Sequence, residues 1–459
     1  MLFNTFVFLF GFLPVALLSH WAVERAKPEW RLPLLLILSL FFYGYWDWRF
    51  TPLLVASVSL NWLIAHAFIR SGRDILIPLG ITANLLVLAV FKYFNFFAGL
   101  IALLPGLGVP AAPFDIALPL GISFFTFHHI MYLTDLKKGN APRYDLVRYG
   151  LYIAFFPQVL AGPLVRWSEI MHQFDERPYL RRDGTERFAR GLMLLTCGLA
   201  KKSFLGDPLA EYVNPIFQAA ELGKAVTTGE AWQAALGFTF QIYFDFSGYT
   251  DMALGIALLF GILLPPNFDV PYRAVSLQDF WRRWHMTLSR FLRDYLYIAM
   301  GGSRKGLAIQ LAALFATMTL GGLWHGAGLT FVAWGAAHGL ALGAGVLWRR
   351  AGVPLPRPVG WIMTFVFVML TWVLFRATSF DAALRIYEAL LGFGAPGLGI
   401  KWRTILVAAL IATLGPTAWD LVHRLPPHRW IAAALALALV IVLFKIGDDA
   451  NYEFIYFQF

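Results

Sequence analysis

The sequence contains very little cysteine and little charge. Its one cysteine, Cys197, lies in an apolar run of the 459-residue chain, which excludes a disulfide framework and a cluster of thiolate metal ligands. Charged residues make up 14% of the chain, against roughly 25% in a soluble domain. Hydrophobic residues make up 59%, and the mean hydropathy is +0.64. This composition excludes a soluble globular enzyme, a disordered chain and a nucleic-acid-binding domain, and it indicates a polytopic membrane protein.

Acidic residues are also scarce: 27 Asp and Glu stand against 37 Lys and Arg, a formal net charge of +10. Lys and Arg gather in the cytoplasmic loops of membrane proteins, so this excess requires no nucleic acid or acidic partner. Basic residues follow the first, third and fifth apolar runs, at 25–31, 70–73 and 137–148. This pattern predicts an N-terminus outside the membrane. The acidic pair Asp448-Asp449 follows the last run and places the C-terminal tail, 447–459, outside as well.

Many apolar runs approach the length of about 20 residues that a membrane-spanning helix needs. They lie at 2–19, 32–49, 52–69, 75–98, 117–135, 149–165, 190–205, 232–262, 307–324, 328–347, 359–377, 404–421 and 430–446. These runs predict an all-α protein with about eleven transmembrane helices. The run at 149–165 is interrupted by Pro157 and predicts a re-entrant segment, since irregular backbone at membrane depth needs cover from protein. The run at 232–262 is too long for one upright helix and predicts a break near Ser247-Gly248.

No linker separates the chain into parts, so we expect a single membrane domain over 1–459. Within it, 265–305 is a charged segment that does not fit a simple bundle and is predicted to be cytoplasmic or interfacial. At helical spacing, one face of this segment carries Trp281, His285, Ser289 and Leu292, and i,i+4 ion pairs are expected for Asp279–Arg283 and Arg290–Asp294. One interpretation is an amphipathic helix in the membrane interface, with arginines toward lipid head groups. That interpretation does not explain His285 on the apolar face.

A second histidine, His325, lies within the glycine-rich stretch GGLWHGAG at 321–328. An ionisable residue at membrane depth is costly and is a functional candidate by default, and the glycines allow close approach of backbone or ligand. The alternative is a histidine that bonds a backbone carbonyl between packed helices. Structural roles are the favoured interpretation for His338, His128, His129, Asp245 and Asp251. Phosphate-loop, zinc-helix and nucleophile-elbow motifs are missing, which leaves histidine general-base chemistry and predicts no metal.

Several segments carry a specific pattern in a fixed order. They are LPLGISF at 118–124, AGP at 161–163, YFDFSGYTDM at 243–252, PNF at 266–268, DFWRRWH at 279–285, LWHG at 323–326 and FIYFQF at 454–459. Together they resemble the motifs of the membrane-bound O-acyltransferase (MBOAT) family, in its alginate O-acetyltransferase-like branch. The resemblance spans nearly the whole chain. It implies a ring of tilted helices, with re-entrant and interfacial helices, around a central tunnel.

The resemblance also implies an activity. His325 is expected to be the catalytic residue and His285 the second essential histidine. A hydroxyl oxygen would attack the carbonyl of a cytoplasmic thioester, expected to be acetyl-CoA, while His325 removes the hydroxyl proton. The residues expected along the donor tunnel are Trp284, Trp324, Arg282, Arg283 and Ser289. Head-group contact remains the alternative for the arginines, and Trp284, Trp324 or a protonated His285 could each donate to the carbonyl oxygen.

The tail contains a further candidate, Tyr456. It is expected either to belt the outer interface or to accept the acetyl group and relay it outward as a covalent nucleophile. The resemblance implies a location in the bacterial inner membrane, surrounded by lipid. It also implies a periplasmic SGNH-hydrolase-like acyltransferase partner and an exported polysaccharide, alginate or a similar glycan, as final acceptor. O-acylation of peptidoglycan, a lipid or a protein remains an alternative, and a transporter is less favoured because no inverted repeat is seen.

Overall fold

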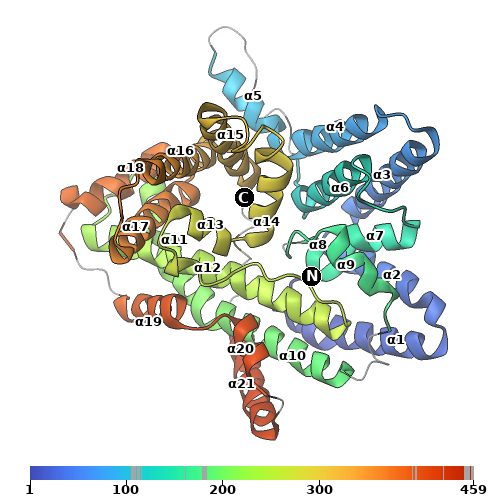
Figure 1. The fold of residues 1–459 in the computed structure, drawn as a ribbon. Coiled ribbons are helices and arrows are strands. Elements are labelled where there is room, and N and C mark those ends of the chain that lie inside the picture. The colour runs from blue at the N-terminus through green and yellow to red at the C-terminus, as the bar shows by residue number, and fades with distance from the viewer. Residues whose placement is uncertain are drawn as a thin grey trace. The chain divides into compact units, whose positions relative to one another are not determined.

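The computed structural model describes residues 1–104, 110, 114, 116–160, 162–177, 183–394, 396–397, 401–426, 428–448 and 455. Every regular element in these residues is a helix, which confirms the all-α prediction (Figure 1). The chain forms two compact units. The first unit contains Met1–Leu195 and Thr250–Pro265, and the second contains Thr196–Tyr249 and Pro266–Phe459. The single domain predicted over 1–459 stays a prediction.

The first unit is built from helices of mixed length joined by short turns. Within it α2 packs against α7, α4 packs against α6, and α3 contacts α4, α6 and α7. Its elements are η1 (Val7–Phe12), α1 (Leu13–Ala26), η2 (Pro28–Trp30), α2 (Arg31–Trp46), η3 (Trp48–Phe50), α3 (Thr51–Ser71), α4 (Leu76–Leu88), η4 (Ala89–Tyr93), α5 (Phe94–Ala102), α6 (Ile122–Lys137), α7 (Leu146–Ala154), α8 (Phe156–Val159), α9 (Trp167–Ile170) and η5 (Met171–Asp175). Helix α10 (Gly184–Lys201) begins in this unit and ends in the second.

The second unit contains the segments that carry both candidate histidines. Its most extensive helix pair is α15 with α16, and α17 packs against α16 in turn. Its elements are η7 (Lys202–Gly206), α11 (Asp207–Glu221), most of α12 (Thr228–Leu259), η8 (Pro271–Arg273), α13 (Leu277–Arg283), α14 (Met286–Phe291), η9 (Leu292–Tyr297), α15 (Leu307–His325), α16 (Leu329–Ala351), α17 (Arg357–Arg376), α18 (Phe380–Glu388), η10 (Ala389–Phe393), α19 (Trp402–Leu414), α20 (Ala418–Arg424) and α21 (Arg429–Asp448).

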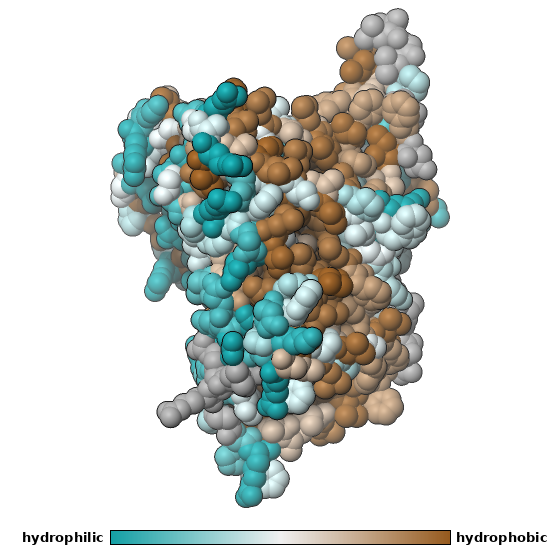
Figure 2. Space-filling view, turned by 90° about the vertical axis from the view of Figure 1, so that its right-hand side faces the viewer, coloured by the Kyte–Doolittle hydropathy of each residue, from teal (hydrophilic) through white to brown (hydrophobic). Residues whose placement is uncertain are grey.

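Seven helical stretches of the described residues are long and apolar enough to cross a membrane. They are Val7–Ala26, Trp48–Ser71, Leu76–Ala102, Leu307–His325, Leu329–Ala351, Arg357–Arg376 and Arg429–Ile446, and α19 with α20, bent by 57°, could form an eighth. Large apolar side chains point outward from these helices; Leu18 and Phe444 are 66% and 75% exposed. Figure 2 shows wide areas of apolar residues on the visible face, a surface that lipid covers. The protein is a multi-pass membrane protein, and the count of about eleven spans stays a prediction.

Helix α12 corrects one expectation, because the break predicted near Ser247-Gly248 is wrong. The helix runs without interruption from Thr228 to Leu259. Gly248 serves helix packing instead: a Cβ atom there would lie 2.9 Å from the Gly198 carbonyl oxygen on α10. Small residues let two helix backbones approach closely, so the glycine that suggested a break is needed for contact between helices.

The interruption predicted within 149–165 is confirmed. Helix α7 ends at Ala154, and Phe155 leaves the helical region with φ −51° and ψ 115° before the short α8 begins. Pro157 lies in the first turn of α8, where its missing N–H loses no hydrogen bond. The residues of both helices are buried except for the first turn of α7. Re-entry into a membrane stays a prediction.

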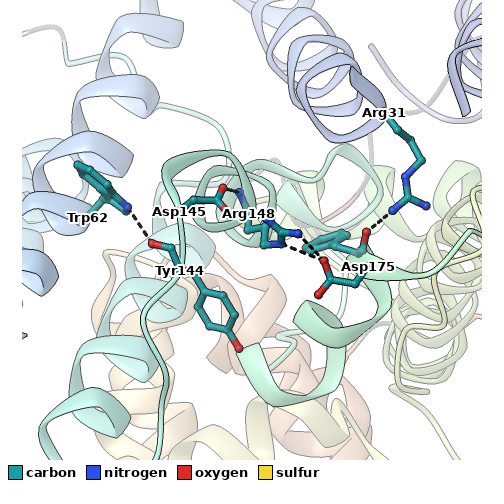
Figure 3. Close-up of polar contacts among 7 residues, drawn as sticks. Arg31, Trp62, Tyr144, Asp145, Arg148 and Asp175 are labelled. Atoms are coloured by element: carbon teal, nitrogen blue, oxygen red, sulfur yellow. Dashed lines mark hydrogen bonds and ion pairs between the residues drawn. The ribbon is translucent and has the colours of Figure 1, made fainter. Parts of the chain in front are cut away.

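A polar cluster joins α7 to η5 in the first unit (Figure 3). The Arg148 guanidinium pairs with Asp145 at 2.5 Å and also with Asp175. Partial burial disfavours the Asp145 carboxylate, but hydrogen bonds from Arg148 outweigh that effect and hold the pKa of Asp145 below its ordinary value. Arg31, at the start of α2, donates to main-chain oxygens of Phe174 and Glu176. These contacts fix the chain entering and leaving the interrupted helix.

Candidate active site

His285 occupies a break between two short helices, so the continuous amphipathic helix predicted across the charged segment is wrong. Helix α13 ends at Arg283 and α14 begins at Met286. Between them His285 has a left-handed backbone with φ 42°. Such a conformation is uncommon for a non-glycine residue and persists only where surrounding contacts impose it. The predicted shared face of Trp281, His285 and Leu292 therefore does not exist on one helix.

Asn267 supplies the contacts that impose this turn. Its main-chain oxygen accepts a hydrogen bond from the Met286 N–H at 2.9 Å. Its side-chain Oδ1 lies 3.1 Å from His285 Nδ1, 3.1 Å from the Thr287 main-chain nitrogen and 2.9 Å from Thr287 Oγ1. His285 and Asn267 are buried, at 0% and 1% exposure. A hydrogen-bond set of this kind outweighs the cost of the left-handed residue.

His325 is the last residue of α15 and is also buried. The glycines around it are required by the close crossing of α15 and α16. A Cβ atom on Gly322 would overlap the Phe331 carbonyl oxygen, and one on Gly326 would overlap the Phe331 ring. The end of α15 is therefore packed tightly against α16 next to His325.

Trp324 brings the two candidate histidines into one aromatic cluster. Its ring centroid lies 6.4 Å from that of His285 and 4.9 Å from that of His325. The His325 ring also meets Trp334 edge-on at 5.3 Å and Phe375 at 5.2 Å. Residues from α15, α16 and α17 thus surround the histidines with aromatic rings. Burial lowers the pKa of the His285 imidazole to about 3, so this ring is neutral at physiological pH.

A cavity of about 440 Å³ lies beside this cluster, within the second unit. Its wall combines apolar side chains with several arginines, and Met286, the residue after His285, contributes to it. Arg282 and Ser289, both predicted for the donor tunnel, line the cavity, together with Trp281, Arg290 and Arg349. A wall that combines apolar side chains with arginines suits a ligand that has both an acyl chain and phosphates.

Three other residues predicted for the tunnel are not among the described residues that line this cavity. Arg283 forms ion pairs with Asp279 at 2.9 Å, as predicted, and with Asp269 at 3.1 Å. Trp284 is 1% exposed and stacks on aromatic neighbours. Trp324 contacts the two histidines. Arg282 therefore lines the cavity and Arg283 does not, although the sequence had predicted both for the donor tunnel.

The remaining histidines have well-defined packing partners. His338 accepts at Nδ1 from the Trp281 indole N–H at 3.2 Å and contacts Thr371 Oγ1 at 3.0 Å. In the first unit, His129 bridges the Tyr149 hydroxyl at 2.7 Å and Ser57 Oγ at 3.0 Å. His128 bonds the main-chain oxygen one turn earlier on α6. These contacts agree with the structural roles predicted for all three.

A buried ion cluster in the second unit was not predicted. Lys202, 1% exposed, donates to Asp207 at 2.9 Å and to Asp245 at 2.7 Å. The other Asp245 oxygen accepts the main-chain N–H of Ile455 at 2.8 Å. Asp245 is therefore paired with Lys202 rather than placed at a helix break. Tyr456 and the rest of its motif lie outside the described residues.

The buried contacts of two residues in this region were not predicted from the sequence. Asn267 stood inside the PNF motif without a role, although a polar amide between proline and phenylalanine is a signal of a buried contact. Lys202 stood at the end of an apolar run next to Lys201, where a lysine predicts a buried carboxylate partner. Among the residues that the structure describes, no group of three or more His, Cys, Asp or Glu side chains could hold a metal ion.

Comparison with known proteins identifies the family of this chain. A sequence model of the membrane-bound O-acyltransferase family (MBOAT) matches residues 68–380. The chain belongs to this family. The match includes both candidate histidines of this MBOAT protein, whereas the tail with Tyr456 lies beyond it. The protein is accordingly a multi-pass membrane protein of an O-acyltransferase family.

Individual relatives cover most of the MBOAT chain. It is 40% identical over 428 residues to a probable alginate O-acetylase, AlgI, of Pseudomonas aeruginosa, covering 90% of this chain and 79% of that protein. It is 37% identical over 438 residues to a peptidoglycan O-acetyltransferase of Helicobacter pylori, covering 87% and 81%. A teichoic acid D-alanyltransferase of Streptococcus thermophilus is 26% identical over 285 residues, covering 56% and 68%.

Proposed function

We propose that this MBOAT protein transfers an acetyl group from cytoplasmic acetyl-CoA toward a polysaccharide outside the bacterial inner membrane, with alginate or a similar exported glycan as the final acceptor. The observation that carries the proposal is the pair of buried histidines, His285 and His325, which both contact Trp324 beside an arginine-lined cavity. The names of the relatives at 37–40% identity support acetyl transfer to a polymer.

The cavity is the proposed site for part of the donor. Coenzyme A carries several phosphate charges, which arginine guanidinium groups bind with charge-assisted hydrogen bonds. Arg282, Arg290 and Arg349 supply such groups at the cavity wall. The apolar surface that includes Trp281 suits the pantetheine arm and the acetyl group. The donor would therefore approach from the side where basic residues gather, the predicted cytoplasmic face.

The proposed chemistry uses His325 as general base and His285 as a second active-site group. His325 takes the proton of the acceptor hydroxyl while the oxygen attacks the thioester carbonyl. The tetrahedral intermediate then collapses, the carbon–sulfur bond breaks, and coenzyme A leaves as a thiol after it receives the proton. General-base catalysis raises the reaction rate by about 10²–10⁴-fold, so positioning of donor and acceptor must provide much of the remaining rate enhancement.

The proposal includes a relay through Tyr456. Tyrosine can form a covalent intermediate when a base lies beside it, and the first acceptor hydroxyl would then be its phenol. Ile455, the preceding residue, is 2% exposed and is held by Asp245, which supports an anchored tail. A periplasmic SGNH-hydrolase-like acyltransferase partner, with a serine nucleophile, would take the acetyl group from the tyrosine ester and pass it to the glycan.

The test combines a purified protein and a cellular assay. Purified protein is expected to release thiol from acetyl-CoA, and the His325→Ala variant is expected to lose this activity by at least about 10²-fold while it still expresses and inserts. His172→Ala, at an exposed histidine of η5, is the matched control. Near-normal thiol release by His325→Ala would refute the assignment of the base. Flux of an intact substrate without acyl transfer would refute the enzyme and favour a transporter.

Peptidoglycan is a second candidate acceptor. The specific observation in its favour is the 37% identity to the Helicobacter pylori protein named for that activity. Ester-linked acetate measured separately in the cell wall and in the secreted polysaccharide, before and after deletion of the gene, distinguishes the two acceptors.

A further inference from the structure

The amide oxygen of Asn267 reveals which nitrogen of His285 carries a proton. The Thr287 main-chain N–H lies 3.1 Å from Asn267 Oδ1, and a main-chain N–H can only donate. The atom that faces it must therefore be the amide oxygen rather than the amide nitrogen, so the orientation of the Asn267 side chain is fixed. Thr287 Oγ1, 2.9 Å away, is a third neighbour of the same oxygen.

The same oxygen lies 3.1 Å from His285 Nδ1. An amide oxygen accepts and never donates, so the hydrogen between these two atoms belongs to Nδ1. A neutral imidazole with its hydrogen on Nδ1 carries its lone pair on Nε2. Burial lowers the pKa of His285 to about 3, which agrees with a neutral ring. The tautomer of a histidine is set in this way by the hydrogen bond of its other nitrogen.

The backbone contacts show that Asn267 also holds the main chain at His285. His285 is held at φ 42° because the Asn267 main-chain oxygen accepts from the Met286 N–H at 2.9 Å. One residue thus holds both the backbone and the ring nitrogen of His285. Strain that is imposed so specifically is typical of groups that must be positioned for function.

We propose that Asn267 is a positioning residue that fixes His285 in the Nδ1–H tautomer, so that Nε2 accepts a hydrogen bond from an N–H of the bound donor, such as an amide of the pantetheine arm, while His325 takes the proton of the acceptor hydroxyl. His285 would then not serve as a cationic donor to the thioester oxygen, one of the roles that the sequence left open. The identity of the reactants rests on the proposed function, whereas the tautomer does not.

The first test reads the tautomer directly. Full-length protein labelled with ¹⁵N-histidine is purified in detergent at pH 7, and the His285 signals are assigned by their loss in His285→Gln. The expected result is a protonated Nδ1 and an unprotonated Nε2 in the wild-type protein. A protonated Nε2, or a ring with both nitrogens protonated, would overturn the proposal. Because no substrate is needed, this result is independent of whether the acetyl transfer itself is correct.

The second test separates positioning from folding. Asn267→Leu keeps the size of the side chain and removes the acceptor, so kcat for thiol release is expected to fall by about 10²-fold while KM for acetyl-CoA changes little. Thr287→Val is the matched control, because it removes one donor to the same oxygen and leaves the Nδ1–H bond; it is expected to cost less than about threefold. Equal losses in the two variants would mean that the Nδ1–H bond contributes nothing of its own, and would refute the positioning role.

Discussion

The Asp245 carboxylate joins the Lys202 side chain to the C-terminal segment: Oδ1 lies 2.7 Å from Lys202 Nζ, and Oδ2 accepts the Ile455 N–H at 2.8 Å. A buried ammonium group is tolerated only with opposite charge close by, and Asp207 supplies the second carboxylate at 2.9 Å. Lysine and tail therefore share one acceptor on α12. Because Lys202 bonds Oδ1 of Asp245, Oδ2 of the same carboxylate accepts the Ile455 N–H.

Asp245→Asn is expected to loosen this attachment. The substitution removes one of two carboxylates from a buried lysine, a type of change that costs up to about 3–5 kcal/mol, and it weakens the acceptor for the Ile455 N–H. In a Cys197→Ser background, an Ile455→Cys probe should react slowly with a maleimide in otherwise wild-type protein. The same probe should react faster with Asp245→Asn, and glycan acetylation in cells should fall.

Asp207→Asn is the matched control for that experiment. It also removes a carboxylate from Lys202 but leaves Asp245 to hold the tail. Both variants should lower the melting temperature, whereas only Asp245→Asn should speed labelling at position 455. Equal labelling rates in the two variants would show that the tail does not depend on Asp245.

Much of the architecture was predictable from the sequence because its signals are local. The low charge, the long apolar runs and the proline at 157 predicted an all-α membrane protein with an interrupted helix near 149–165, and the structure has both. The i,i+4 pair Asp279–Arg283 was predictable for the same reason. The number of membrane spans is harder to predict from local signals, since short or tilted helices also cross a membrane.

The errors arose where distant residues decide local structure. The spacing of Trp281, His285 and Leu292 fits one helix, but Asn267, 18 residues before His285, breaks that helix by bonding the turn. Gly248 suggested a break, whereas its use depends on Gly198 in another helix. Neither partner can be found from periodicity, because each lies far away along the chain. The ion pair of Lys202 with Asp245, 43 residues apart, was missed for the same reason.

Arg282 and Arg283 are adjacent but should behave differently. Arg282 lines the cavity, whereas Arg283 is engaged by Asp269 and Asp279. Arg282→Gln should raise KM for acetyl-CoA by about tenfold, the equivalent of one lost charge-assisted hydrogen bond of about 1.5 kcal/mol, with a weaker dependence of KM on salt. Arg283→Gln should leave KM close to wild type and lower the melting temperature slightly. Steady-state kinetics at two ionic strengths measures KM for acetyl-CoA in both variants. A raised KM in Arg283→Gln alone would contradict the assignment of the cavity as the donor site.

Gly335→Ala should disturb the candidate site from a distance. A Cβ atom on Gly335 would overlap the Met318 carbonyl oxygen, so α15 and α16 would have to separate next to His325. Overpacking of this kind typically costs about 1–3 kcal/mol, and kcat should fall because the His325 ring moves. Gly345→Ala on the same helix is the control: its Cβ would meet only the Arg349 side chain, at 3.7 Å. There alanine should be neutral or stabilise by up to about 1 kcal/mol. Thermal unfolding of both variants would measure this, and equal effects would argue against tight packing at Gly335.

Tyr456→Phe tests the relay by removing only a hydroxyl. A phenylalanine ring can still lie in the membrane interface. If Tyr456 only anchors the tail, glycan acetylation should therefore stay at the wild-type level. A relay predicts that acetylation of the glycan in cells is abolished, because the ester to the phenol oxygen cannot form. Intact-mass analysis after exposure of the purified protein to acetyl-CoA should find an added acetyl group in wild type and none in Tyr456→Phe. Tyr452→Phe, in the same tail but outside the FIYFQF motif at 454–459, is the control and should keep both signals. Full glycan acetylation by Tyr456→Phe would eliminate the relay and leave the acceptor hydroxyl to the glycan or to the periplasmic partner, with His325 still required as the base in the membrane.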